Sequence, residues 1–390
     1  MELFEELVKR GHHPDVVTYN TLIDSLCKAG DLEEARRLHG DMSSRVSRCC
    51  VPNVVTYSVL INGLCKVGRI DEARELIQEM MRKSCDVLPN IITYNSFLDG
   101  LCKQSMMAEA CELMRSLRDG SLRVSPDTVT FSTLIDGLCK CGQTDEACNV
   151  FDDMIAGGYV PNVVTYNVLM NGLCKTDKME RAHAMIESMV DKGVTPDVIT
   201  YSVLVDAFCK ASHVDEALEL LHGMASRGCT PNVVTFNSII DGLCKSDQSG
   251  EAFQMFDDMT LKHGLAPDKI TYCTLIDGLF RTGWAGQAEV LLDAMPDPDT
   301  YAFNCCINGL SKLGDVSRAL HRMLELELVP DKVTFNILIA GACKAGNFEQ
   351  ASALFEEMVA KNLQPDVMTF GALIDGLCKA GQVEATWDIM

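Results

Sequence analysis

Hydrophobic residues recur along the chain at helical intervals, in pairs of stripes separated by short polar segments. In residues 163–197, a polar segment at 175–178 separates two stripes, and Gly193 follows the second. The first stripe is Tyr166, Leu169, Met170 and Leu173, and the second is Ala182, Met185, Ile186 and Met189. Because this spacing places each set on one helix face, we predict two helices, with Thr165 as N-cap of the first and Gly193 ending the second.

This pair of predicted helices returns throughout the chain. The segment V-V-T-Y-N-T-L-I-D-S-L-C-K-A-G, which begins at Val16, recurs nearly unchanged. We therefore predict ten tandem repeats, preceded by a partial repeat at 1–15 and followed by a truncated eleventh at 367–390. The ten are residues 16–53, 54–90, 91–127, 128–162, 163–197, 198–232, 233–268, 269–299, 300–331 and 332–366. Repeats eight and nine are the shortest, so we expect a shorter second helix or exit turn there and a local change of superhelical pitch.

Neither helix of a repeat could bury its hydrophobic stripe alone, whereas stacked pairs share one core. The sequence therefore predicts an all-α solenoid. The composition agrees, because 47% hydrophobic residues supply a continuous core and 6% aromatic residues disfavour a β-rich fold.

The chain has 19 cysteines, and the one that recurs in the repeats indicates a small buried apolar residue in a reducing compartment. Nine of them occupy the same L-C-K setting or a close variant, each without a neighbouring partner. No C-x-x-C pair has the second pair or histidines that a zinc site needs, so we predict no metal site. The sequence contains no apolar run of 18 residues, so we predict no membrane-spanning helix. The acidic N-terminus resembles neither a signal peptide nor a transit peptide.

Two polar positions vary together from repeat to repeat. Counting from the first residue of each repeat, position 5 is Asn20, Ser58, Asn95, Ser132, Asn167, Ser202, Asn237, Cys273, Asn304 and Asn336, and the last position is Asn53, Asn90, Asp127, Asn162, Asp197, Asn232, Asp268, Asp299, Asp331 and Asp366. Serine is followed by a final asparagine in all three cases, and asparagine by a final aspartate in five of six. Helix capping explains why the last position is Asp or Asn. We do not expect capping to make the choice between Asp and Asn depend on a residue some thirty positions earlier. We therefore predict that both positions face one unit of a ligand.

Two further positions complete the predicted site. Position 2 is Val17, Val55, Ile92, Val129, Val164, Ile199, Val234, Ile270, Tyr301 and Val333, and position 13 is Lys28, Lys66, Lys103, Lys140, Lys175, Lys210, Lys245, Arg281, Lys312 and Lys344. Core packing is the alternative for position 2, and a favourable interaction with the helix dipole is the alternative for the cations. The formal charge of −21 disfavours a nucleic-acid ligand. We expect the acidic residues to gather on the second helices, where salt screens them from a ligand on the other face.

The repeat period, the V-x-T-Y-N-x-L-I-x-G-L-C-K-x-G opening and the P-D or P-N ending resemble the pentatricopeptide repeat family. The wording L-I-D-G-L-C-K-A-G is especially similar to plant P-class, fertility-restorer-like members. The resemblance implies a right-handed superhelical solenoid that binds single-stranded RNA in a mitochondrion or chloroplast, as a monomer, for RNA processing, stabilisation or translation. It implies that position 2 lies between neighbouring bases, and that position 13 contacts phosphates. For position 5 and the last position, it implies that Ser with Asn favours adenine and that Asn with Asp favours uracil. Asn with Asn would favour either pyrimidine.

The predicted target is therefore 5′-(C/U)AUAUAUNUU-3′, where N is the base of repeat eight, left open because Cys273 and Asp299 depart from the usual pairs. No phosphate-binding loop or catalytic set stands out, so we predict no enzyme activity and no cofactor. Other RNA-processing proteins are further expected partners. A protein-binding scaffold and a truncated, non-functional product remain alternatives.

Overall fold

The computed structural model describes residues 4, 14–43, 50–82, 87–312, 321, 323–324 and 328–379. In these ranges the chain forms twenty helices, which confirms the all-α prediction. The first helices of the repeats are α2 (Val16–Ala29), α4 (Val54–Val67), α6 (Ile91–Lys103), α8 (Thr128–Lys140), α10 (Val163–Lys175), α12 (Val198–Lys210), α14 (Val233–Lys245), α16 (Lys269–Arg281), α18 (Thr300–Lys312), α20 (Lys332–Lys344) and α22 (Val367–Lys379). The second helices are α3 (Leu32–Ser43), α5 (Ile70–Arg82), α7 (Met107–Arg118), α9 (Thr144–Ala156), α11 (Met179–Asp191), α13 (Val214–Ser226), α15 (Ser249–Leu261), α17 (Ala285–Asp293) and α21 (Phe348–Ala360).

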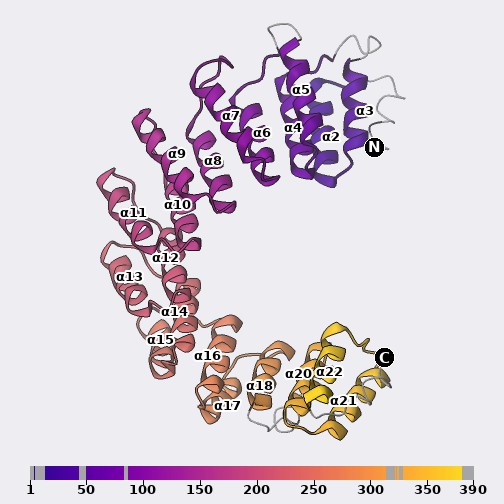
Figure 1. Ribbon diagram of the computed structural model, residues 1–390, viewed down its shortest axis with the longest axis vertical. Coiled ribbons are helices and arrows are strands. Elements are labelled where there is room, and N and C mark those ends of the chain that lie inside the picture. The colour runs from indigo at the N-terminus through magenta and orange to yellow at the C-terminus, as the bar shows by residue number, and fades with distance from the viewer. Residues whose placement is uncertain are drawn as a thin grey trace. The chain divides into compact units, whose positions relative to one another are not determined.

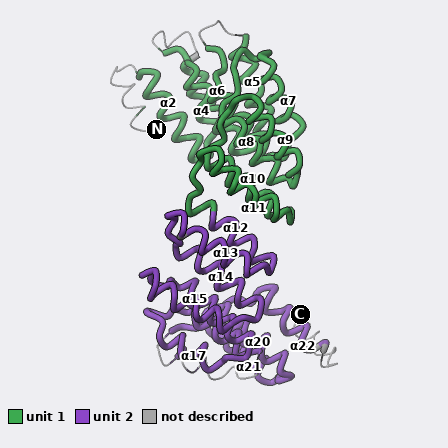
Figure 2. Tube along the Cα trace, turned by 90° about the vertical axis from the view of Figure 1, so that its left-hand side faces the viewer, with its two compact units in different colours: residues 1–200 green, residues 201–390 purple. Residues whose placement is uncertain are grey.

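The helices stack as antiparallel pairs, and within each unit first helices pack on their own second helices and on the first helix of the next repeat, as α4 packs on α5 and α6 and α14 on α15 and α16 (Figure 1). The chain divides into two compact units, residues 1–200 and 201–390 (Figure 2). Within each unit the first helices form one layer and the second helices another.

Each first helix begins at a cap supplied by the preceding repeat, which corrects the predicted N-cap at Thr165. The N-cap of α10 is Asn162, whose side chain accepts a hydrogen bond from the Thr165 backbone N–H at 2.9 Å. Thr165 is the third helical residue, and its hydroxyl accepts from the Asn162 N–H to complete a capping box. At the end of α11, Gly193 has the expected positive φ of 73°.

A glycine at position 10 lets neighbouring first helices approach closely. A Cβ atom built on Gly137 would lie 2.5 Å from Cys102 Sγ, and one built on Gly100 would lie 2.7 Å from Cys65 Sγ. The repeated cysteine is therefore a small packing residue, as predicted. Burial raises the pKa of the Cys65, Cys102 and Cys139 thiols to about 12.

The second helix of repeat eight is short, as expected from the repeat's length. Helix α17 has 9 residues, whereas α15 in the preceding repeat has 13. The second helix of repeat nine lies outside the described residues. None of the described helices is long and apolar enough to cross a membrane.

Candidate nucleic-acid interface

Positions 2, 5, 9 and 13 of a first helix lie on one face, because they are three or four residues apart. In residues 201–390 this face borders a groove of about 500 Å³. Its lining residues are Asp241, Ile270, Cys273, Thr274, Asp277, Arg281, Tyr301, Asn304, Cys305, Asn308, Val333 and Ile337. The groove thus brings together predicted residues of all three kinds: position 2, position 5 and the cation.

The position-2 side chains are exposed, so ordinary core packing does not explain them. Tyr301 is 63% exposed, and the least exposed of the ten, Val333, is still 51% exposed. The others are Val17, Val55, Ile92, Val129, Val164, Ile199, Val234 and Ile270, which are 55–69% exposed. A regular row of exposed apolar side chains marks an interaction surface.

In the Asn/Asp repeats, position 5 and the last position contact each other directly. Asn95 Nδ2 donates a hydrogen bond to Asp127 Oδ1 at 3.1 Å, and the hydroxyl of Thr130 donates to Asn95 Oδ1 at 2.7 Å. The same Asn-to-Asp bond, at 3.2–3.4 Å, joins Asn167 to Asp197, Asn237 to Asp268, Asn304 to Asp331 and Asn336 to Asp366. Each pair is therefore a fixed unit at the N-terminus of the next first helix.

In the Ser/Asn repeats, the serine contacts the buried threonine instead. Ser58 Oγ lies 2.8 Å from Thr93 Oγ1, while Asn90 Oδ1 accepts from the Thr93 backbone N–H at 3.0 Å. Ser132 and Ser202 lie equally close to Thr165 and Thr235, at 2.7 and 2.9 Å. The threonine at position 3, which we predicted as a cap, thus links the two variable positions.

These contacts correct one step of the sequence argument. We did not expect the identity of the capping residue to depend on a residue thirty positions earlier. The structure nevertheless places position 5 and the last position together at the same helix cap. Part of their joint variation is therefore internal, because an asparagine amide at position 5 donates to a final aspartate, whereas a serine there contacts the threonine and not the final asparagine.

The two kinds of pair leave different polar atoms free. In the Asn/Asp repeats three, five and seven, the hydrogen bonds from the asparagine and threonine side chains all go to Oδ1 of Asp127, Asp197 and Asp268, so neither side chain occupies Oδ2. In the Ser/Asn repeats, the carbonyl oxygen of the final asparagine accepts from the backbone N–H of the threonine, and its amide group donates no hydrogen bond to the described residues. The last position therefore offers an acceptor in one class and a donor in the other.

Hydrogen bonds keep the final aspartates ionised. Burial raises the pKa of Asp127, but hydrogen bonds from the backbone and side chain of Thr130 and from Asn95 outweigh it and hold the pKa below its usual value. The same balance lowers the pKa of Asp197, Asp268 and Asp331. These carboxylates act only as acceptors at neutral pH.

Repeats one and eight depart from both classes. In repeat one, the final Asn53 already accepts from the N–H of Thr56, and Asn20 Oδ1 is buried without a hydrogen-bond partner in the described part of the chain. In repeat eight, Cys273 is buried, and Asp299 caps α18 and pairs with Lys269 at 2.9 Å. Asp366 pairs with Lys332 in the same way.

The predicted row of cations is exposed, but most of it is paired with carboxylates that we had not included in the site. Position 9 carries an aspartate four residues before the lysine, as in Lys103–Asp99 at 2.6 Å and Lys140–Asp136 at 2.5 Å. Lys28–Asp24, Lys210–Asp206 and Lys245–Asp241 are the other such pairs, at 2.5–2.6 Å. Lys312 lies 3.8 Å from Asp277, the position-9 residue of the preceding repeat. Acidic residues are therefore not confined to the second helices. The i, i+4 spacing of Asp and Lys was the sequence signal for these pairs.

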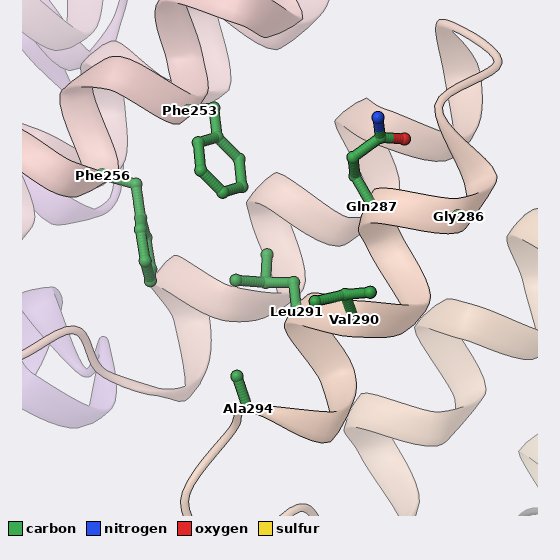
Figure 3. Close-up of a pocket in the computed structure, with 7 residues that line it drawn as sticks. All are labelled: Phe253, Phe256, Gly286, Gln287, Val290, Leu291 and Ala294. Carbon is green, nitrogen blue, oxygen red and sulfur yellow. The ribbon is translucent and has the colours of Figure 1, made fainter.

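A second hollow, of about 510 Å³, lies between the second helices α15 and α17. Phe253 and Phe256 face Leu291, Val290 and Ala294 across it, with Gln287 and Gly286 at one end (Figure 3). None of the predicted site residues lines this hollow. Within the described ranges no group of three His, Cys, Asp or Glu residues could hold a metal ion.

Comparisons with known proteins give consistent matches. The PPR repeat family model matches residues 1–28, 14–66, 52–87, 89–140, 126–175, 161–210, 203–245, 231–281 and 330–389, and a PPR repeat model matches 270–297 and 301–326. A pentatricopeptide repeat-containing protein of Arabidopsis thaliana is 37% identical over 65 residues, which are 16% of this chain and 13% of that protein.

Similar solved structures include the maize pentatricopeptide repeat protein PPR10, with 25% identity and a TM-score of 0.44 over 99% of this chain and 64% of that one. PPR10 in complex with an 18-nucleotide psaJ RNA element has 25% identity and a TM-score of 0.44, over 100% of this chain and 70% of that one. Yeast Rmd9p in complex with a 16-nucleotide target RNA has 12% identity and a TM-score of 0.44, over 94% and 79%. The chain thus spans less than two thirds of the curated relative and of the first PPR10 structure.

Proposed function

Because the chain belongs to the PPR repeat family, whose members bind single-stranded RNA, we propose that it binds single-stranded RNA with one base per repeat. The proposal is supported by the shared face of positions 2, 5 and 13, which combines exposed apolar side chains, fixed polar pairs and cations. A single strand is bound by apolar contacts to the faces of its bases, polar contacts to their edges and cations near its phosphates.

The free polar atoms support the base assignment. Uracil has an N–H donor at the centre of its Watson–Crick edge, and Oδ2 of Asp127, Asp197 or Asp268 can accept a hydrogen bond from it. Adenine has an acceptor nitrogen at that place, which the free amide of Asn90, Asn162 or Asn232 can contact. We therefore propose 5′-(C/U)AUAUAUNUU-3′ as the target, with the base of repeat eight open.

Fluorescence anisotropy tests the function directly. We expect the wild-type protein to bind 5′-CAUAUAUGUU-3′ RNA tightly at about 150 mM salt, close to physiological ionic strength. The matching DNA, and an RNA in which every A and U are exchanged, should bind far more weakly. Equal weak binding to all three would contradict the proposal and favour a protein-binding scaffold or a non-functional product.

A paired substitution separates base recognition from the internal contacts. Ser132→Asn with Asn162→Asp converts repeat four to the class of repeat three, and should change the fourth preferred base from A to U by roughly 10- to 100-fold, since a good polar contact set is worth about 1–3 kcal/mol. Ser132→Asn alone, which breaks the match within the protein, is the control. If the double variant kept its stability but still preferred A, the joint variation would serve only the fold.

We further propose that the protein acts as a monomer in a mitochondrion or chloroplast, where it takes part in RNA processing, stabilisation or translation with other RNA-processing proteins. Its L-I-D-G-L-C-K-A-G segment at 373–381 and the close variants in other repeats support a place among the fertility-restorer-like P-class members. In this role it would act by occupying RNA and not by catalysis. Crosslinking to organellar RNA in a plant cell tests this role.

A further inference from the structure

The groove cations fall into two classes. Lys28, Lys103, Lys140, Lys210 and Lys245 are each paired with an aspartate one helical turn earlier. In repeats two and five, position 9 is Asn62 or Asn171, and Lys66 and Lys175 make no ion pair within the described ranges. In repeat ten it is Ala340, and Lys344 is likewise unpaired there. Repeats eight and nine share one carboxylate, because Asp277 of repeat eight pairs with Lys312 of repeat nine at 3.8 Å. Arg281 of repeat eight makes no ion pair in the described part of the chain.

The position-9 residues belong to the same face as the base contacts. Asp241, Asp277 and Asn308 line the groove together with Tyr301 and Asn304. The paired lysines remain 49–67% exposed and their aspartates 38–44% exposed, so a phosphate that reaches the lysine also meets the carboxylate.

We propose that an aspartate at position 9 weakens the phosphate contact of the cation with which it pairs, whereas a cation without such a partner keeps a strong phosphate contact. The proposal rests on the proposed RNA binding and names a further set of affinity-determining residues, Asp24, Asp99, Asp136, Asp206 and Asp241. In consequence the chain holds the RNA backbone mainly at repeats with an unpaired cation, and sequence-independent binding is suppressed.

Counterion release gives the physical reason. A free lysine that neutralises a phosphate releases a condensed cation from the RNA, which favours binding at low salt. A lysine already neutralised by an aspartate brings no net charge to the phosphate, so it contributes little to this release. The slope of log affinity against log salt should therefore reflect the number of unpaired cations and not all ten.

The test is the slope of log affinity against log salt, measured with the matched RNA, the A/U-exchanged RNA and a 20-nucleotide oligouridine. The triple variant Asp24→Asn, Asp99→Asn, Asp136→Asn should steepen the slope by about 2, because a single strand contributes about 0.7 per neutralised phosphate. It should raise the affinity for matched and exchanged RNA by the same factor. Asn62→Asp with Asn171→Asp should flatten the slope by about 1.4.

A second triple variant controls for total charge. Asp71, Asp145 and Asp153 are ion-paired carboxylates on the second helices, with partners at 2.5–2.7 Å, and their replacement by asparagine changes the net charge equally. Circular dichroism would establish that every variant is folded, and asparagine is the native residue at position 9 in three repeats.

The outcomes separate this inference from the proposed function. If both triple variants changed the slope equally, the position-9 inference would be overturned while matched RNA binding stood. If only the groove variant steepened the slope but no RNA was preferred, the inference would stand and sequence-specific recognition would fail. If the wild type bound no RNA at low salt, the proposed function would fall, and the inference with it.

Discussion

The threonine at position 3 performs two tasks that belong to different repeats. Its backbone N–H and hydroxyl bond the cap of its own helix, and the same hydroxyl bonds position 5 of the preceding repeat, as Thr130 does with Asp127 and Asn95. Thr130 is fully buried. A change at position 5 therefore alters the RNA-facing surface and the junction between repeats together.

Residue chemistry alone did not locate the cap. Asn162 and Thr165 are both good capping residues, and only the extended backbone of Asn162, with φ −102° and ψ 175°, decides between them. The contact between Asn95 and Asp127 was likewise hidden, because it joins residues 32 apart and forms only when two repeats stack. The sequence left core packing open for position 2, and only the structure excludes it, because these apolar side chains are exposed.

Cysteine reactivity tests the packing at position 12. Burial raises the pKa of Cys139 to about 12, so only about one thiol in ten thousand is ionised at pH 8, whereas Cys141 is exposed two residues later. Because the thiolate is the nucleophile, we expect iodoacetamide to alkylate Cys141 in the native protein and to leave Cys139 unmodified.

Peptide mass mapping after limited reaction at pH 8 would measure both sites. In denaturant the two thiols should react alike, which serves as the control. Comparable alkylation of Cys139 and Cys141 in the native protein would show that the first helices do not pack as described.

At the scale of elements, the sequence determines helices well because each repeat is a copy of the last. The first helices begin at Val16, Val54 and Ile91, where the repeated segment begins. The charge pattern was harder to interpret, since we assigned acidic residues to whole helices and not to helix faces. Asp99 and Lys103 lie on the same face of α6, and this pairing follows from helical spacing once the face is considered.

The glycine at position 10 gives a prediction about helix stacking. Gly137→Val would place three carbon atoms where even a Cβ lies 2.5 Å from Cys102 Sγ and 2.7 Å from its Cβ. Overpacking of this kind costs about 1–3 kcal/mol, so we expect a lower denaturation midpoint. Urea unfolding followed by circular dichroism would measure the change.

Gly223 provides the matched control. It lies within α13, and a Cβ there would meet nothing within 4 Å. Gly223→Ala should therefore stabilise the protein by about 0.5–1 kcal/mol through helix propensity alone. A loss of stability in both variants, or in neither, would contradict the role of position 10 as a contact between first helices.

At the scale of the whole molecule, 55 acidic residues oppose 34 basic ones. Ion pairs between repeats on the second helices, such as Arg118–Asp153 at 2.5 Å and Arg74–Glu109 at 2.6 Å, use many of the cations. Exposed pairs of this kind contribute little stability individually, and the remaining carboxylates repel one another. The net charge thus disfavours both the folded chain and generic RNA binding.

Salt should therefore act on the fold and on RNA binding in opposite directions. From about 10 to about 150 mM the screening length falls from about 30 to about 8 Å, which weakens repulsion between carboxylates more than it weakens short ion pairs. We expect the melting temperature to rise over this range while the affinity for the matched RNA falls, because salt opposes counterion release. The Asp71→Asn, Asp145→Asn, Asp153→Asn variant is three charges less negative and should gain less from salt. A melting temperature that fell with salt would mean that the ion pairs between repeats, and not the net charge, dominate the electrostatics of the fold.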